Sequence, residues 1–272
     1  NIPLIMTPHG EDIQRVPEIN YGLRLDKKWD RIIRNNLKVA DLVTAISHSV
    51  ENELGFLEQT KIRRIPNGVN VATYRAERGT YLRERLGIEQ GKVIFLSVGR
   101  NHIKKGYEYG IKAIASLANS YGEKSIHYVI VGRGVSSHAE LVRTLGMESH
   151  ISLIEEIAPD EVLKCYSSAD VFFSPSIIEG LSLVSIEAIA SGLPLVVTDV
   201  PGNIDIVEDT NAGLVARASD IEDMSQQLAK FMDGKTRNEY AKSARAGAKI
   251  YDWSAIAKQY TQAYEETVNA IR

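Results

Sequence analysis

The chain contains very little cysteine. Cys165 is the single cysteine among 272 residues. An internal disulfide is therefore excluded, and with it the disulfide-rich secreted scaffolds. The composition fits a reducing compartment, so we expect a cytoplasmic protein. Cys165 falls in a helix-like stretch, DEVLKCYSSAD, and since cysteines are among the most buried residues we expect a core thiol there.

Long apolar runs and an excess of charge of one sign are also missing. No apolar stretch approaches the roughly 20 residues that a membrane-spanning helix needs. The 32 basic and 35 acidic residues give a net charge of −3, which provides no general attraction for nucleic acid or an acidic partner. What remains is an ordinary globular protein, long enough for one large domain or two smaller ones.

The first residues lack both an initiator methionine and the basic segment of a signal peptide. They read NIPLIMTPHG and begin directly on an apolar strand pattern. Because this resembles the interior of a domain, we expect an N-terminal portion of the natural protein to precede Asn1.

Strong turn chemistry at Pro66-Asn67-Gly68 separates two regions of different periodicity. Before it come a polar, basic, helix-like stretch at 19–40, an apolar run at 41–47 and a helix-like segment at 47–57. We place a domain boundary near residues 66–75.

Beyond this turn, short apolar segments rich in Val and Ile alternate with helical patterns. This alternation predicts a parallel sheet covered on both faces, which is a doubly wound α/β domain. The expected strands are 93–99, 126–132, 151–154, 170–175, 194–199 and 213–216. The expected helices are 106–118, 138–145, 159–168, 183–190, 204–207, 221–232, 237–250 and 254–271.

Polar residues cluster where these strands end, which is where a doubly wound sheet binds its ligand. Arg100 and Lys105 follow the first strand, and their cationic side chains suit phosphate oxygens. Gly132 ends the second strand, where a small residue lets the backbone approach a ligand. The sequence therefore predicts a diphosphate-binding edge.

Two carboxylates flank the turn Gly180-Leu181-Ser182. Glu179 lies at a strand end and Glu187 lies inside the next helical pattern. Both can face a ligand at that helix N-terminus, where backbone amides and the helix dipole favour an anion. Carboxylates suit sugar and ribose hydroxyls, so cations and carboxylates together indicate a nucleotide-sugar.

The order and spacing of six segments resemble retaining glycosyltransferases of the GT-B fold, family 4, whose signature is two glutamates like Glu179 and Glu187. The segments are TPHG at 7–10, IPNGVN at 65–70, SVGR to KKG at 97–106, VGRG at 131–134, SSADVFFSPS at 167–176 and EGLSLVSIEAIASGLPLVVTDVPG at 179–202. The resemblance implies two Rossmann-like domains. It assigns 1–70 to a partial, acceptor-side N-terminal domain, 71–253 to the nucleotide-sugar domain and 254–272 to a helix that packs back on the first domain.

The resemblance also implies a role for each matching residue. It places Arg100 and Lys105 on the donor diphosphate, Glu179 near the transferred sugar, the amides of Leu181, Ser182 and Leu183 on sugar and phosphate, Glu187 on the ribose hydroxyls, Ile157 at the nucleobase and His9 at the reacting centre. Two departures bear on the identity of the base: Glu155 stands where the family often has glycine, and the turn is Gly-Leu-Ser where Gly-Phe-Gly is commoner.

The expected function is transfer of a sugar from a UDP- or GDP-linked donor to a glycan, lipid-linked sugar or cell-envelope precursor. The resemblance implies that the anomeric configuration is retained. We expect no cofactor and no metal, because the sequence has no Asp-x-Asp motif and no histidines at metal-ligand spacing.

Several alternatives stay open at this point. The chain could be a donor-binding fragment without activity or a GT-B-fold sugar-nucleotide epimerase; a phosphorylase would need a cofactor lysine context that is not seen. The stretch Tyr21–Val39 carries six basic residues. It is either a solvated helix face or a peripheral contact with anionic lipid at the inner face of the membrane.

Overall fold

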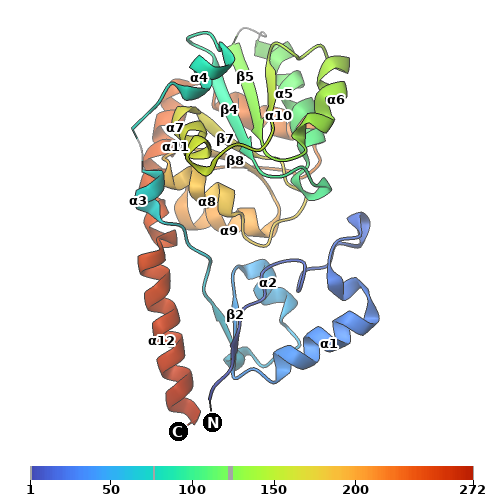
Figure 1. The fold of residues 1–272 in the computed structure, drawn as a ribbon, viewed down its shortest axis with the longest axis vertical. Helices are drawn as coiled ribbons and strands as arrows, with labels where there is room; N and C mark the ends of the chain where they lie inside the picture. The colour runs from blue at the N-terminus through green and yellow to red at the C-terminus, as the bar shows by residue number, and fades with distance from the viewer. Residues whose placement is uncertain (1, 76, 122–124, 272) are drawn as a thin grey trace.

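Two parallel sheets organise the chain in a computed structural model that describes residues 2–75, 77–121 and 125–271. The larger, six-stranded sheet lies at the top of Figure 1 and the smaller, three-stranded sheet at the bottom. Residues up to β3 (Ile62–Arg64) build the smaller unit, and β4 (Val93–Val98) begins the larger sheet.

The larger sheet has the strand order β6-β5-β4-β7-β8-β9, and all its neighbouring strands run parallel. Its other strands are β5 (Ile126–Val131), β6 (Ile151–Ile154), β7 (Val171–Ser174), β8 (Leu195–Thr198) and β9 (Gly213–Ala216). Each lies within one residue of the expected strand at either end, because a buried parallel strand is a nearly continuous apolar run.

Alternate residues of these strands enter two different cores. Ile94 and Leu96 pack on one face of the sheet, while Val93 and Phe95 pack on the other. The covering helices are α4 (Tyr81–Leu86), α5 (Tyr107–Tyr121), α6 (Ala139–Thr144), α7 (Pro159–Ser168), α8 (Leu183–Ala190), α9 (Pro201–Thr210), α10 (Ile221–Lys230) and α11 (Gly234–Gly247). The predicted doubly wound α/β architecture is confirmed.

The smaller unit has the strand order β1-β2-β3, again all parallel. Its elements are β1 (Ile5–Met6), α1 (Lys27–Lys38), β2 (Leu42–Ala45), α2 (His48–Glu53) and β3. The helix α12 (Trp253–Ile271) runs from the larger unit down beside this sheet, as Figure 1 shows. There Ile256 and Ala263 pack against Leu42 and Ile65.

Helix ends differ most from the sequence-based expectation. The basic stretch 21–39 is α-helical only from Lys27, because the Asp26 carboxylate accepts hydrogen bonds from the amides of Lys28 and Trp29 and so begins the helix. Helix α9 begins at Pro201 instead of residue 204, since proline at the first helical position needs no amide partner. Asp233 caps α11, which begins at Gly234, three residues before the expected start.

The single cysteine lies in the core. Cys165 is fully buried and burial raises its pKa to about 12, so the prediction of a core thiol is confirmed.

Across the described residues, no helix is both long enough and apolar enough to cross a membrane.

Candidate functional site

The strand order places a switch point between β4 and β7. The chain proceeds outward from β4 to β5 and β6, then returns to the other side of β4 with β7. Loops that leave the carboxyl ends of β4 and β7 therefore diverge and leave a crevice between them. Arg100 and Lys105 follow β4, and the segment from Glu179 to Glu187 follows β7.

Lys105 and Glu179 meet in this crevice. The Lys105 Nζ lies 2.7 Å from Glu179 Oε1, and the two side chains are 14% and 6% exposed. Ser176 Oγ donates a hydrogen bond to the same carboxylate oxygen at 2.9 Å. Gly106, next to Lys105, has φ 61° and a Cβ there would lie 2.0 Å from the Pro175 carbonyl oxygen, so only glycine allows the two loops to approach this closely.

Arg100, Gly132 and Ile157 surround one pocket of about 270 Å³ beyond the ends of β4 and β5. Gly132 has φ 154° and packs against Gly99, whose carbonyl oxygen would lie 2.0 Å from a Cβ. Arg100 is exposed and Ile157 is partly buried. The pocket thus combines a cation, a bare backbone segment and an apolar side chain, which are the chemical features that a base and its phosphates need.

Glu155, the residue that departs from the family pattern, has a local role. Its carboxylate accepts hydrogen bonds from the amides of Gly134 at 2.7 Å and Ser136 at 2.9 Å. Hydrogen bonds from Ser136 and Gly134 lower the Glu155 pKa. Glu155 therefore fixes the loop that follows Gly132.

The turn before α8 brings the two units together. Leu181 and Ser182 are buried and Leu183 is exposed. At this start of α8, the first backbone amides have no partner within the helix. A Cβ on Gly180 would lie 2.7 Å from the carbonyl oxygen of His9. The segment after β1 thus lies directly against the glutamate-flanked turn.

Glu187, on α8, has partners that the sequence did not indicate. Tyr166 OH donates to Glu187 Oε2 at 2.8 Å, and the Tyr74 ring packs edge to face against the Tyr166 ring with centroids 5.9 Å apart. Burial raises the Glu187 pKa, against the opposing hydrogen bond of Tyr166 and the charge of Lys105. Neither tyrosine belongs to a motif, so only the fold brings them to Glu187.

His9 and Gln14 reach the site from the smaller unit. His9 is exposed, and its Nδ1 lies 3.3 Å from Asn67 Nδ2 in the linker. Gln14 Nε2 donates to the Glu179 carbonyl oxygen at 3.1 Å and to Ser49 Oγ at 2.9 Å. Gln14 was not predicted from the sequence, since no local signal marks a contact 165 residues away.

A second cavity of about 530 Å³ opens beside Gln14, between α2 and the loops that precede α8 and α9. Its polar lining includes Arg15, Arg34, Asn52 and Glu53. Ile178, next to Glu179, also lines it. The cavity therefore borders the segment that carries Glu179.

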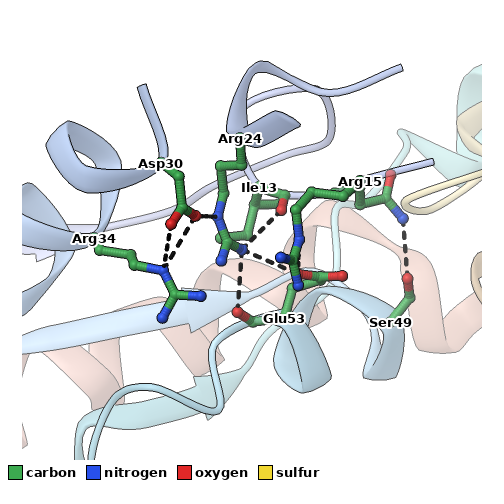
Figure 2. Close-up of polar contacts among 8 residues, drawn as sticks. Ile13, Arg15, Arg24, Asp30, Arg34, Ser49 and Glu53 are labelled. Atoms are coloured by element: carbon green, nitrogen blue, oxygen red, sulfur yellow. Dashed lines mark hydrogen bonds and ion pairs between the residues drawn. The ribbon is translucent and has the colours of Figure 1, made fainter. Parts of the chain in front are cut away.

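A buried arginine supports the wall of this cavity. Figure 2 shows Arg24 between Asp30 and Glu53; its Nε lies 2.7 Å from Asp30 Oδ1 and its Nη1 lies 3.0 Å from Glu53 Oε2. Arg34 also pairs with Asp30, at 3.0 Å. Arg24 and Arg34 thus form ion pairs within the protein, although both belong to a stretch expected to be solvated or lipid-facing.

Metal ligands do not gather anywhere in the described part of the chain: no group of three His, Cys, Asp or Glu side chains is arranged to hold an ion. Arg100, Lys105 and the first amides of α8 are groups that can bind a phosphate.

Comparison with known proteins shows the family. Residues 80–247, more than half of the chain, match the model of the family described as glycosyl transferases group 1. The chain is 27% identical over 220 residues to the D-inositol 3-phosphate glycosyltransferase of Nocardia farcinica, covering 78% of this chain and 49% of that protein. It is 27% identical over 264 residues to sulfoquinovosyl transferase SQD2 of Arabidopsis thaliana, covering 94% and 50%.

Solved structures share the fold. Sucrose-phosphate synthase from Thermosynechococcus elongatus superposes with a TM-score of 0.82 at 23% identity, over 98% of this chain and 68% of that one. Anabaena Alr3699/HepE in complex with UDP and glucose gives 0.82 at 19% identity, over 97% and 72%. The architecture is therefore that of GT-B glycosyltransferases.

The chain spans about half the length of the curated relatives first matched. The matched family segment contains Arg100, Lys105, Gly132, Ile157, Glu179 and Glu187, while His9 precedes it. On the strength of this match, the chain belongs to the glycosyl transferases group 1 family.

Proposed function

We propose that the protein transfers a sugar from a nucleoside-diphosphate sugar, UDP- or GDP-linked, to a hydroxylated acceptor with retention of anomeric configuration and without a metal. The observation that carries this proposal is the meeting of Lys105 and Glu179 at the switch point, next to a cation-lined pocket and the start of α8. Family membership supports the same reaction class, and the alternatives of an epimerase or an inactive donor-binding fragment have no observation of their own.

The donor's diphosphate would lie between Lys105, Arg100 and the first amides of α8. A glycosyl transition state develops positive charge on the sugar while the leaving diphosphate gains negative charge. Fixed cations and amide dipoles aimed at that diphosphate stabilise the transition state without reorganising. Glu187 would bind the ribose, Ile157 the base and Glu179 the transferred sugar. A donor phosphate oxygen would take the acceptor's proton on the face that the leaving group occupies.

The acceptor would enter from the smaller unit. His9 would lie across from the sugar, since its carbonyl oxygen already lies close to Gly180. The cavity beside Gln14 offers guanidinium groups of Arg15 and Arg34, the Asn52 amide and the Glu53 carboxylate to a hydroxyl-rich molecule. Carboxylate and amide groups bind sugar hydroxyls, and the arginines favour an acceptor that also carries an anionic group.

The proposed function includes a peripheral membrane contact through helix α1. Lys28, Arg31 and Lys38 are exposed on it, together with Trp29 and Ile32. Cations beside an exposed tryptophan suit the surface of an anionic bilayer. Such contact predicts co-sedimentation with phosphatidylglycerol vesicles but not with phosphatidylcholine vesicles, and loss of binding on Trp29→Ala together with Lys28→Ala. Equal sedimentation with both lipids would contradict it.

A thermal-shift panel tests the donor assignment. A ligand that binds only the folded state at 100 times its dissociation constant adds about 2.7 kcal/mol of stability, which for a protein of this size is roughly 5–10 °C in Tm. One of UDP, GDP and ADP should produce such a shift, while uridine, guanosine and adenosine, which lack the diphosphate, should shift Tm much less. No shift with any diphosphate would exclude a nucleotide-sugar donor.

A further inference from the structure

One carboxylate of the larger unit binds a single residue of the smaller unit through both of its oxygens. Asp205 lies on α9 and His48 is the first residue of α2. The His48 backbone amide donates to Asp205 Oδ2 at 2.7 Å, and His48 Nδ1 lies 3.1 Å from Asp205 Oδ1. In Figure 1, α9 lies at the lower side of the larger unit and α2 at the upper side of the smaller one. The pair therefore joins the two units.

Burial makes this carboxylate depend on its partner. The Asp205 side chain is 8% exposed, whereas the His48 side chain is 51% exposed. A buried carboxylate needs hydrogen-bond donors, and both of these donors belong to the other unit. Separation of the units would break the two hydrogen bonds together. Since a hydrogen bond to a charged group is worth a factor of roughly ten or more in an equilibrium, the pair favours the joined arrangement.

A chain of buried hydrogen bonds fixes α9 relative to Glu179. Asn203, two residues before Asp205, donates from Nδ2 to Thr198 Oγ1 at 3.2 Å. Thr198 Oγ1 donates to the Ser176 carbonyl oxygen at 2.5 Å, and Ser176 Oγ donates to Glu179 Oε1 at 2.9 Å. The four residues of this chain are all buried. The position of Asp205 is therefore set relative to the Glu179 carboxylate.

On the smaller unit, α2 is fixed to the segment that reaches the site. Ser49, next to His48, accepts a hydrogen bond from Gln14 Nε2 at 2.9 Å. Gln14 Nε2 also donates to the Glu179 carbonyl oxygen at 3.1 Å. A force that holds His48 therefore also holds the segment 9–14 against the turn that Glu179 begins.

We propose that Asp205 is a positioning residue, which acts through His48 to hold the smaller unit closed against the larger one. Without this carboxylate the units separate and the segment 9–14 leaves the Glu179 turn. The residues assigned to the nucleotide all lie in the larger unit, so the affinity for a nucleoside diphosphate does not depend on Asp205. This last statement rests on the proposed function, whereas the closure of the two units does not.

The distance between the units is the direct readout. Spin labels are attached at Asn35→Cys on α1 and at Glu140→Cys on α6, which are both exposed positions, and Cys165 stays unlabelled because it is fully buried. Double electron–electron resonance then gives the distribution of distances between the labels. The parent protein should show one narrow distribution, and Asp205→Ala should add a second, longer distance.

Two further variants separate the pair from the helix that carries it. His48→Ala removes the ring and keeps the backbone amide, so the longer distance should appear in a smaller proportion than in Asp205→Ala. Because the His48 side chain is half exposed, this variant keeps the test valid if Asp205→Ala does not fold. Asp209→Ala is the matched control: Asp209 lies one turn further along α9 and accepts from Tyr251 OH at 2.8 Å within the larger unit. It should keep the parent distribution.

Two results of the distance measurement would overturn the proposal. One is an unchanged distribution in both Asp205→Ala and His48→Ala. The other is an equal change in Asp209→Ala, which would assign the effect to a general loosening of α9.

Nucleotide binding separates the positioning role from damage to the larger unit. Whichever of UDP, GDP and ADP binds the wild type in calorimetric titration should bind Asp205→Ala with an affinity within about twofold of the wild-type value. A loss of about tenfold or more would place the effect of Asp205 inside the larger unit and would overturn the positioning role. If none of the three binds the wild type, the proposed function fails, and the label distances still decide whether Asp205 holds the units together.

Discussion

Lys105 and Glu179 form an ion pair 2.7 Å long across the switch point of the larger sheet, although 74 residues separate them in the sequence. One residue follows β4 and the other leads from β7 toward α8. Their side chains are almost buried, so each neutralises the other in a place where an unpaired charge would be costly. A donor diphosphate that enters the crevice would have to share the Lys105 ammonium with Glu179.

Replacing Lys105 by alanine should therefore lower turnover more than donor binding. The Lys105 charge contributes most when the diphosphate departs, so we expect kcat to fall more than tenfold while KM for the donor changes by less than about threefold. Lys112→Ala serves as the control, because Lys112 pairs with Glu108 at 2.6 Å on the exposed surface of α5. A change confined to KM would mean that Lys105 binds ground state and transition state alike.

Glu187 should make stability fall as pH rises. Burial raises the pKa of Glu187 in the folded state above its ordinary value of 4.5. Between the unfolded and folded pKa values, the folded state therefore holds more protons than the unfolded state. The free energy of unfolding therefore decreases with rising pH across that window. Urea denaturation of Glu187→Gln between pH 4 and 8, in steps of about half a unit, should lack this component of the decline.

Glu161 should change stability with pH in the opposite direction, and Glu161→Gln tests this in the same measurement. The hydrogen bond from Tyr81 lowers the Glu161 pKa, so the wild type should lose stability as pH falls through the folded value, and the variant should lose less. Identical pH profiles for wild type and Glu187→Gln would show that burial does not raise the Glu187 pKa.

The arginines near the second cavity should differ in their effects on stability. Arg24 has a fully buried side chain, with Asp30 and Glu53 as ion-pair partners, so Arg24→Ala should lower the free energy of unfolding by about 3–5 kcal/mol. Arg15 pairs with the same Glu53 but is 42% exposed, and Arg15→Ala should cost less than about 1 kcal/mol. Equal losses in chemical denaturation would contradict the account of Arg24 as the internal support.

Chelation should leave transfer intact. Arg100, Lys105 and the start of α8 can balance the charge of a diphosphate without a divalent cation. Transfer should therefore persist in EDTA, and NMR of the product's anomeric proton should show the configuration of the donor. Loss of activity in EDTA would reveal a metal requirement, and an inverted product would exclude attack on the leaving group's face.

The sequence predicted the strand-end residues because their positions follow from a general rule of parallel sheets. Lys105, Glu179 and Gly132 each lie in the segment that follows an apolar run, and the carboxyl ends of those runs share one edge. Tyr74, Tyr166 and Gln14 escaped prediction for the converse reason. Each contacts the site through a partner distant in sequence, and their residue types and spacing carry no periodic signal.

Arg24 escaped prediction for an energetic reason. A basic residue in a polar stretch is usually exposed. The sequence offered no sign that ion pairs with Asp30 and Glu53 would offset the burial of the Arg24 charge. The start of α9 was also placed too late, because the apolar pattern begins at Ile204 while the helix begins with Pro201. Patterns of apolar residues mark the buried face of a helix better than its ends.

Calorimetric titration of UDP, GDP and ADP into wild type and Glu187→Ala tests the central claim, that the edge beyond β4, β5 and β7 binds a nucleoside diphosphate. At least one of the three should bind the wild type. Because a hydrogen bond to a charged group contributes about 1.5–3 kcal/mol, the same nucleotide should bind Glu187→Ala about 10- to 150-fold more weakly. Equal affinities would remove Glu187 from the site, and the absence of binding to the wild type would contradict the account as a whole.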